Sequence, residues 1–202
     1  MYTLYYSPGA CSLATQVVLN ELGQAVKIID KNQVDNFSAI NPAANVPVLL
    51  DGNKTLIEGA AILLHILDKH QSPMLPANGE SRQKAIQDIM FANATVHPAY
   101  SKLFFVGRNI TDENAKLTGF NAAAATINGL WAIVESELQS NPFLGGSSPS
   151  AADILLAVYS RWGTFFPVDI TFGEKTTTML NAVQAMPSFT KAVNAEAVAS
   201  AK

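Results

Sequence analysis

The chain changes character at residues 72–80, a stretch that contains two prolines and a glycine. Before this stretch, segments rich in β-forming residues alternate with helical patterns, and after it apolar residues recur only at helical spacing. Proline and glycine interrupt regular structure, so this stretch is typical of a linker. The sequence therefore predicts an α/β domain over residues 1–71 and an all-α domain over residues 81–202.

The first domain is predicted to begin with a strand, a helix and a second strand. Residues 3–6 are rich in β-forming side chains, residues 12–22 keep apolar positions at helical spacing, and residues 26–29 form a second β-rich segment. A unit of this kind is normally parallel and right-handed. We therefore expect the first two strands to pair in parallel.

A β-hairpin is predicted next. Two short apolar runs, residues 46–50 and 55–57, flank an Asp-Gly pair, which is a strong local hairpin signal. Val46 precedes Pro47 and is biased toward an extended conformation in which its N–H and C=O can point away from the sheet. Val46 is thus a candidate docking point for an extended peptide.

The helix expected over residues 60–68 starts directly after the hairpin. A helix N-terminus offers free N–H groups to a carboxylate, and Glu58 offers a charge to an amine. Together with Val46, the Glu58-Gly59 pair supplies what a small peptide requires. The alternative is a plain hairpin followed by a helix, without a ligand.

Long helical patterns fill the second domain. The first covers residues 86–104 and contains Pro98, which predicts a kink and leaves the carbonyl of Ala94 without its usual partner. Three more follow, over residues 112–139, 174–184 and 187–199.

A capping box is predicted before residues 154–159, an apolar run. Ser150 and Asp153 have the required spacing of three residues. Such a cap contributes on the order of 1 kcal/mol to a helix. We therefore interpret both residues as structural.

Composition excludes several classes of protein. Hydrophobic residues make up 49% and charged residues 14% of the chain, which is typical of a folded globular protein. A formal net charge of -3 and the absence of a basic run make nucleic acid an unlikely partner. No apolar stretch approaches the roughly 18 residues of a membrane span, and the start of the chain has no basic segment of a signal peptide. We expect a soluble cytoplasmic protein.

Cys11 is the only cysteine. An intramolecular disulfide and a cysteine-rich zinc site are therefore excluded, and we expect no metal. A lone thiol is either a small buried apolar group or a reactive one, and both interpretations of Cys11 stay open at this point.

Several short motifs fall in the order found in one protein family. They are Leu4-Tyr5-Tyr6-Ser7-Pro8-Gly9-Ala10-Cys11-Ser12-Leu13, Ile40-Asn41-Pro42, Val46-Pro47-Val48-Leu49, Ile57-Glu58-Gly59-Ala60-Ala61-Ile62, His97, Ser150-Ala151-Ala152-Asp153 and Arg161-Trp162. With these motifs the chain resembles the cytosolic glutathione transferases, and most closely the bacterial beta class. The resemblance implies a thioredoxin-like N-terminal domain with a cis Val46–Pro47 bond, an all-α C-terminal domain, glutathione as cosubstrate and a homodimer.

The resemblance also implies roles for individual residues. Cys11 takes the place of the beta-class site cysteine, and Val46 that of the backbone contact to the cysteinyl part of glutathione. Glu58 and Gly59 take the places of the γ-glutamyl contacts, and His97 that of the second-domain histidine facing the sulfur. Ala10 and Asn45 complete the expected set of residues that bind glutathione.

The chain departs from the beta-class pattern at several positions. Ala43 and Ala44 replace the usual Lys-Gly, and Asn45 replaces a longer glutamine. Pro98 replaces the lysine after the histidine, which removes a contact to the glycyl carboxylate unless Lys31 supplies one. Met90 stands where a partner-subunit asparagine reaches the site, and Pro149 replaces an aromatic residue before the capping box. Weaker glutathione binding than is usual for the class is expected.

Cys11 lies at the expected N-terminus of the first helix. An unperturbed thiol has a pKa of about 8.5, and a helix N-terminus lowers this by about one unit, so another donor is needed to hold a thiolate at neutral pH. Ser12 or His97 could supply it. We therefore assign Cys11, Ser12 and His97 as candidate catalytic residues. For His97, which lies on the apolar face of its helix, a purely structural role is the alternative.

Aromatic residues of the second domain could line a pocket for a hydrophobic substrate. The candidates are Tyr100, Phe104, Trp162, Phe165 and Phe166, although aromatics at such spacing also form cores.

Three functions follow from the sequence. The first is conjugation of glutathione to small hydrophobic electrophiles by the bound thiolate. The second is a glutathione-dependent thiol-disulfide or peroxide reductase acting through Cys11, which would need a second thiol from solution because Ala14 leaves no resolving cysteine. The third is a non-catalytic binding protein of the same fold.

Overall fold

The computed structural model describes residues 1–200, which pack as two compact units. The first unit contains Met1–Ile86 and the chain from Gln184 onward, and the second contains Gln87–Val183. The predicted linker at residues 72–80 stays a prediction, because compact packing does not test where a chain divides into independently folding domains.

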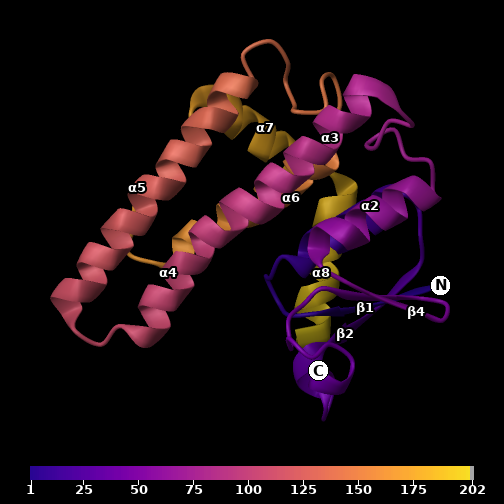
Figure 1. Ribbon diagram of the computed structural model, residues 1–202, viewed down its shortest axis with the longest axis horizontal. Coiled ribbons are helices and arrows are strands. Elements are labelled where there is room, and N and C mark those ends of the chain that lie inside the picture. Colours follow the sequence, from indigo (N-terminus) through magenta and orange to yellow (C-terminus); the bar gives the residue numbers. More distant parts are fainter. Residues whose placement is uncertain (201–202) are drawn as a thin grey trace. The chain divides into compact units, whose positions relative to one another are not determined.

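A four-stranded mixed sheet forms the centre of the first unit (Figure 1). Its strands are β1 (Tyr2–Tyr6), β2 (Val26–Asp30), β3 (Val48–Asp51) and β4 (Lys54–Ile57), in the spatial order β2-β1-β3-β4. β1 pairs with β2 in parallel and with β3 antiparallel, and β3 and β4 form the hairpin. The parallel pair and the predicted hairpin are both confirmed. This is a thioredoxin-like sheet.

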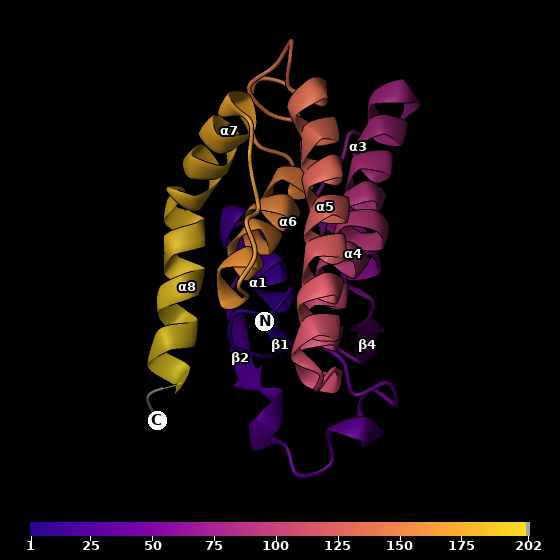
Figure 2. The ribbon, with the colours of Figure 1, turned by 90° about the vertical axis from the view of Figure 1, so that its left-hand side faces the viewer.

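Helix α1 (Ser12–Glu21) is the most enclosed element of this unit. Its residues from Ser12 to Leu19 are all buried, because α1 contacts β1, α2 (Gly59–Lys69) and α8 (Pro187–Ser200). The last helix of the described chain therefore lies along the first one (Figure 2). Asn20 of α1 donates a side-chain hydrogen bond to the carbonyl of Ser188 in α8 over 3.1 Å. Two 3₁₀ turns, Lys31–Gln33 and Phe37–Ala39, connect β2 to the hairpin.

Helices make up the second unit. α3 (Gly79–Phe91) crosses the boundary between the units, and α4 (His97–Asn109), α5 (Glu113–Glu137) and α6 (Ala151–Tyr159) follow. A 3₁₀ segment, Ser160–Phe165, comes after α6, and α7 (Glu174–Gln184) ends at the boundary. α4 and α5 lie side by side in both ribbon views. Together the two units give the fold that the sequence predicted, a thioredoxin-like domain and an all-α domain.

The predicted interruption at Pro98 is confirmed as a π-helical segment. Residues Ala92–Val96 form this segment between α3 and α4. Proline has no N–H, so Pro98 cannot donate to the carbonyl of Ala94 as an α-helix would require. The wider π turn accommodates this missing bond directly before His97.

The predicted capping box at the start of α6 is also confirmed. The Asp153 N–H donates to the Ser150 hydroxyl over 3.3 Å, and the Ser150 N–H donates to the Asp153 carboxylate over 2.8 Å. Asp153 has no exposed surface, and its burial raises the pKa of its carboxyl. The cap fixes where the fully buried helix α6 begins.

Within residues 1–200, helix α5 is long and apolar enough to cross a membrane by length and composition alone. Of its most apolar stretch, 33% is buried. Core helices of soluble proteins meet the same criterion, so α5 is weak evidence for a membrane span.

Candidate active site

Strand pairing brings three chain segments to one edge of the sheet. Tyr5 of β1 lies opposite Val48 of β3, and Val48 lies opposite Ile57 of β4. The end of β1, the start of β3 and the end of β4 therefore meet at the same edge. The turn that leads to Cys11, the residues before Val48 and the residue after Ile57 share this location.

Cys11 is in direct contact with Val46 at this edge. The Cys11 thiol donates a hydrogen bond to the Val46 carbonyl, with 3.4 Å between sulfur and oxygen. Cys11 is the residue before α1 and is half-buried. Burial raises the pKa of the Cys11 thiol to about 11, although the backbone N–H groups of Cys11 and Ser12 act in the opposite direction. At neutral pH the free protein therefore carries a neutral thiol.

Ser12 belongs to the turn that delivers Cys11. Its hydroxyl is fully buried and accepts a hydrogen bond from the Ser7 N–H over 3.4 Å. The Ala10 N–H donates to the Ser7 carbonyl over 3.0 Å and closes the turn. The Ser12 hydroxyl thus stabilises the turn, while its N–H lowers the pKa of the neighbouring thiol.

The loop before β3 has a defined conformation. The Val46–Pro47 peptide bond is cis, as the resemblance implied, and Val46 is half-buried. The Asn41 side chain donates to the Asn45 carbonyl over 2.8 Å. The side chain of Asn45 itself is exposed.

Lys31 lies on the same loop. Its ammonium donates to the carbonyl of Ala44 over 3.1 Å, and Ala44 has a positive φ of 53°. The bond from Lys31 supports this uncommon backbone conformation. In the free protein the Lys31 ammonium therefore already has a hydrogen-bond partner within the loop.

Glu58 occupies the position before α2 with a φ of 68°. A non-glycine residue in this region of backbone space stores on the order of 1 kcal/mol of strain or more, and such residues cluster at binding sites. The Glu58 side chain is exposed and makes no capping hydrogen bond to the helix. The first N–H groups of α2, beginning with Gly59, have no partner inside the helix and are available to an anion.

His97 lies in an aromatic environment of the second unit. The centroid of its ring is 5.2 Å from that of Tyr159 and 5.2 Å from that of Trp162. Burial lowers the pKa of His97. The imidazole is therefore neutral at neutral pH and can donate or accept one hydrogen bond at each nitrogen, depending on its tautomer.

The predicted substrate-lining aromatics are placed differently from one another. Trp162 contacts Tyr100 and Phe104, with ring centroids 5.9 and 6.0 Å away. Tyr100 is fully buried and accepts a hydrogen bond from the indole of Trp131 over 2.9 Å, and burial raises the pKa of its hydroxyl. Phe165 is 63% exposed, and its neighbour Phe166 packs on Phe104 instead.

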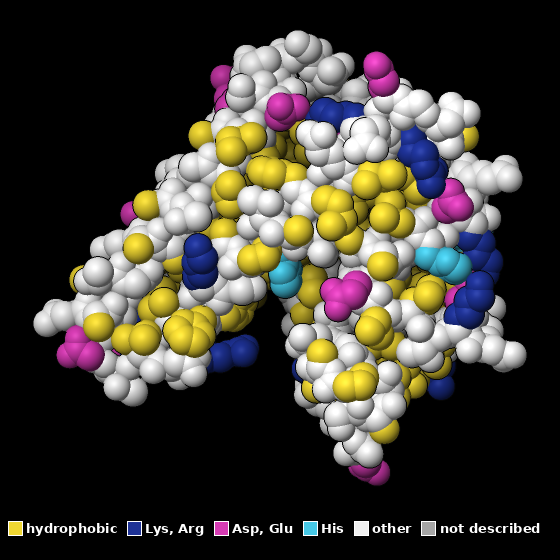
Figure 3. Space-filling model, viewed as in Figure 1, with side chains coloured by type: hydrophobic (Ala, Val, Ile, Leu, Met, Phe, Trp, Pro, Cys, Tyr) yellow, Lys and Arg dark blue, Asp and Glu magenta, His cyan; other side chains and the backbone are white. Residues whose placement is uncertain are grey.

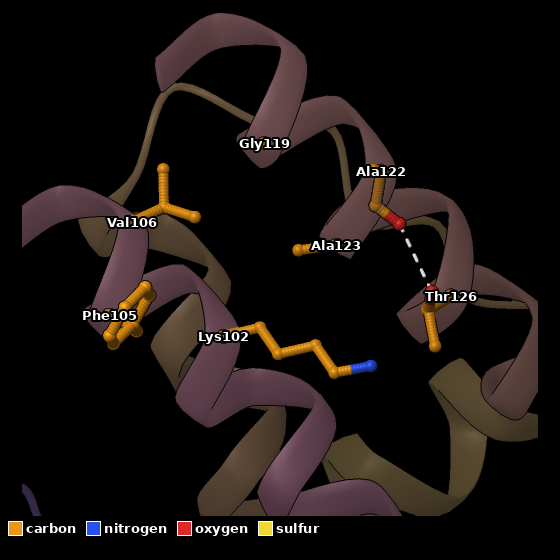
Figure 4. Close-up of a pocket in the computed structure, with 7 residues that line it drawn as sticks. All are labelled: Lys102, Phe105, Val106, Gly119, Ala122, Ala123 and Thr126. Atoms are coloured by element: carbon orange, nitrogen blue, oxygen red, sulfur yellow. Dashed lines mark hydrogen bonds between the residues drawn. The ribbon is translucent and has the colours of Figure 1, made fainter. Parts of the chain in front are cut away.

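A separate groove of about 310 Å³ lies between α4 and α5 (Figure 4). It is lined by Lys102, Phe105 and Val106 of α4 and by small residues of α5 that include Gly119. Hydrophobic side chains gather over the joined ends of these two helices (Figure 3). None of the residues predicted to contact a second substrate lines this groove. In residues 1–200, no group of three or more His, Cys, Asp or Glu side chains could hold a metal ion.

Of the two adjacent aromatic residues predicted to line the substrate pocket, Phe166 contacts Phe104, whereas Phe165 is 63% exposed. Sequence reasoning missed Glu196. Glu196 of α8 bonds to the turn before Cys11. The only sequence feature that could have indicated this role is an acidic residue within an alanine-rich helical segment.

Comparison with known proteins gives a consistent family assignment. Residues 1–68 match the family described as glutathione S-transferase, N-terminal domain. The chain is 30% identical over 174 residues to glutathione S-transferase GST-4.5 of Xanthomonas campestris pv. campestris. This alignment covers 83% of this chain and 85% of the relative.

Solved structures agree with this similarity. The bacterial beta class glutathione S-transferase of Sphingomonas chungbukensis superposes with a TM-score of 0.82 at 30% identity, covering 96% of this chain and 98% of that one. A sphingomonad glutathione S-transferase in complex with glutathione superposes with a TM-score of 0.83, also at 30% identity and with the same coverage of 96% and 98%.

Proposed function

Because this chain belongs to the glutathione S-transferase family, we propose that it binds glutathione at the sheet edge and conjugates the glutathione thiolate to small hydrophobic electrophiles. The observation that carries the proposal is the contact of 3.4 Å between the Cys11 sulfur and the Val46 carbonyl oxygen. It places a thiol directly beside a main-chain group that an extended peptide can use.

The cysteinyl and γ-glutamyl parts of glutathione each have a partner in this proposal. The cysteinyl main chain pairs with Val46, the γ-glutamyl carboxylate accepts from the N–H of Gly59 at the start of α2, and the Glu58 carboxylate binds the amino group. Ala10 and the side chain of Asn45 border the same edge. The glutathione bound to the similar sphingomonad enzyme supports glutathione as the ligand.

Ligand binding would change the partner of the Cys11 thiol. In the free protein the Val46 carbonyl accepts from this thiol. A cysteinyl N–H of glutathione competes for the same oxygen, and the displaced Cys11 S–H then has the glutathione sulfur as its nearest acceptor. A hydrogen bond to the charged form of a group favours that form, so the exchange lowers the pKa of the bound glutathione thiol. Cys11 acts as a donor in this step and keeps its proton.

The raised pKa of Cys11 favours conjugation over reduction through Cys11. With a pKa of about 11, roughly one Cys11 in ten thousand is a thiolate at pH 7. A reductase cycle needs that thiolate as its attacking group. The bound glutathione thiolate is therefore the better nucleophile, with Ser12 supporting the turn and neutral His97 as the candidate second donor.

The second substrate is proposed to meet the aromatic side chains of the second unit. Phe104 and Trp162 are in mutual contact, Tyr100 packs behind them, and Phe165 offers an exposed ring. Such a surface suits a small apolar electrophile. We also expect the protein to be a homodimer and to lie in the cytoplasm. Light scattering of the purified protein tests for the dimer.

One set of assays tests the proposed function. Retention on immobilised glutathione, conjugation of chlorodinitrobenzene and reduction of a glutathione mixed disulfide are measured for wild type, Cys11→Ala and His97→Ala. The proposal expects retention, and conjugation that survives Cys11→Ala with a loss of about tenfold to a hundredfold, the effect of one hydrogen bond to a charged group. Loss of conjugation in Cys11→Ala, together with strong reduction of the mixed disulfide by wild type, would assign the reductase. Retention without either activity would assign a non-catalytic binding protein.

A further inference from the structure

Glu196 is a buried acid that the proposed chemistry does not use. It lies on α8 and is 6% exposed. One carboxylate oxygen accepts from the Gly9 N–H over 2.9 Å, and the other accepts from the Gln16 side-chain amide over 2.5 Å. Gln16, on α1, is 1% exposed.

Burying a carboxylate is unfavourable unless it receives strong hydrogen bonds. Bonds to a charged acceptor are shorter and stronger than bonds between neutral groups. The carboxylate of Glu196 therefore imposes a position on its donors, and one of these donors is the main chain of a tight turn. Gly9 has a φ of 69°, a conformation that most residues avoid.

The turn held in this way leads directly to the candidate site. Gly9 precedes Cys11 by two residues, and Ser7 and Ala10 close the turn by a main-chain hydrogen bond of 3.0 Å. The far end of the same segment is the contact between Cys11 and Val46. A displacement of Gly9 would move the thiol relative to the Val46 carbonyl.

We propose that Glu196 is a positioning residue that, through Gly9, holds the Cys11 thiol against the Val46 carbonyl and so shapes the site for the sulfur of glutathione. The part that concerns glutathione rests on the proposed function, whereas the part that concerns the thiol does not. The last helix of the described chain thereby controls the reactivity of a thiol near the beginning of the chain.

A second hydrogen bond between α1 and α8 provides a control for the alternative that Glu196 only fastens these two helices together. Asn20 and Ser188 join the same two helices, α1 and α8, at the opposite end of their contact. Asn20→Ala removes this fastening without touching the turn. Glu196→Ala removes both the fastening to Gln16 and the bond to Gly9. Glu196→Gln keeps an acceptor for Gly9, and the Gln16 amide can turn its oxygen toward the new amide.

Alkylation provides a direct readout, because Cys11 is the only cysteine of the chain. Iodoacetamide is added to each folded protein at one mildly alkaline pH, and the modified fraction is followed by intact mass. Glu196→Ala is expected to speed alkylation about tenfold or more, since losing a hydrogen bond to a charged group raises the population of locally opened turns by that order. Asn20→Ala is expected to stay near the wild-type rate, and Glu196→Gln to lie much closer to wild type than to Glu196→Ala.

Three results would overturn the proposal. They are an unchanged rate in Glu196→Ala, an equal acceleration in Asn20→Ala, or an acceleration in Glu196→Gln as large as that in Glu196→Ala. The last of these would show that an acceptor for the Gly9 N–H, which the glutamine retains, does not hold the thiol in place. If Glu196→Ala does not fold, hydrogen exchange of the Gly9 amide in the wild-type protein decides. Protection is expected, and exchange at the rate of an open loop contradicts the proposal.

Calorimetric titration with glutathione separates this inference from the proposed function. Wild type that does not bind glutathione removes the proposed function, while the alkylation result still stands. Wild type that binds, with Glu196→Ala weakened about tenfold and Asn20→Ala unchanged, supports both. Equal affinities of all three proteins for glutathione would show that Glu196 affects only the Cys11 thiol. This result would overturn its role in the glutathione site.

Discussion

The Cys11 sulfur lies 3.4 Å from the carbonyl oxygen of Val46, and the thiol donates a hydrogen bond to that oxygen. This relationship joins the start of α1 to the loop before β3. Such a bond stabilises the neutral form of the thiol and so acts in the same direction as the burial that raises its pKa to about 11.

Alkylation of Cys11 in the free protein is expected to be slow at neutral pH. Burial raises its pKa to about 11, so the thiolate fraction grows throughout the range from neutral to strongly alkaline pH. The alkylation rate of the folded protein should therefore rise about tenfold per pH unit with no plateau below about pH 10. A plateau near pH 7 would show an activated cysteine and would favour the reductase.

Asn45→Gln is expected to strengthen glutathione binding. The Asn45 side chain is exposed at the sheet edge, and a glutamine adds one methylene of reach toward a bound peptide. One new hydrogen bond corresponds to roughly a fivefold lower Kd. Calorimetry measures the change, and Asn53→Gln in the exposed hairpin turn is the matched control. No gain in Asn45→Gln, or an equal gain in the control, would contradict the placement of the ligand.

Asp51 is expected to make the stability of the first unit depend on pH. Its carboxylate accepts from Lys69 over 2.6 and 2.7 Å and from His65 over 2.9 Å, and these bonds, with Lys69 first, hold the pKa of Asp51 below its usual value. Such an acid stabilises the protein above its unfolded-state pKa of about 3.9, and this stabilisation is lost as the pH falls through the lower folded-state pKa. Bonding to Asp51 raises the pKa of Lys69, which also faces the ring of Tyr2, so its contribution is lost only at strongly alkaline pH.

Urea unfolding of wild type and Asp51→Asn measures this effect. The difference between their midpoints should be constant from about pH 5 to pH 8 and should narrow below about pH 4. Asp68→Asn serves as control, because Asp68 is 65% exposed and its pair with Arg82 at 3.0 Å is a surface ion pair of small effect. A difference that persists unchanged at pH 2 would contradict the role of the Asp51 charge.

Gly173→Ala is expected to destabilise the second unit. A Cβ at this position would collide with the carboxylate of Glu135, which accepts from the N–H groups of Lys175 and Thr176 over 3.2 and 2.8 Å at the start of α7. To make room, the Glu135 side chain would have to move and give up these hydrogen bonds, so the urea midpoint of Gly173→Ala is expected to lie below that of wild type. Gly129→Ala, on the exposed side of α5 with open space around it, is expected to be neutral or stabilising.

A double-mutant comparison identifies the cause. In a Glu135→Ala background the colliding carboxylate is absent, so Gly173→Ala should cost much less than it does in wild type. Equal costs in the two backgrounds would show that the collision is not the reason.

Periodicity and capping signals predicted most of the elements. The helix predicted over residues 174–184 coincides with α7, and Ser150 and Asp153 form the predicted capping box. Pro98 located the interruption of the long helical pattern, although its form as a π segment could not be foreseen from one missing N–H. These signals are local, so a short window of sequence contains them.

Long-range relationships were beyond such reasoning. The sequence placed Cys11 at a helix N-terminus correctly, but its local pattern did not show the burial that raises the pKa of the thiol. Gly9 and Glu196 are separated by 187 residues, and no pattern in either segment indicates the other. The positions of the candidate site therefore stay a prediction from the sequence, whereas the raised pKa of Cys11 and the hydrogen bond from Gly9 to Glu196 on α8 required the packed structure.

The most direct test of the proposed mechanism is the ultraviolet absorbance of thiolate during a titration with glutathione at pH 7. Wild type and Cys11→Ala are compared, and the variant contains no cysteine, so any thiolate it shows belongs to glutathione. The expected result is a saturable signal that approaches one thiolate per chain in wild type and remains, at lower affinity or amplitude, in the variant. A signal that is absent from both proteins, or that vanishes entirely with Cys11, would contradict a bound glutathione thiolate as the nucleophile.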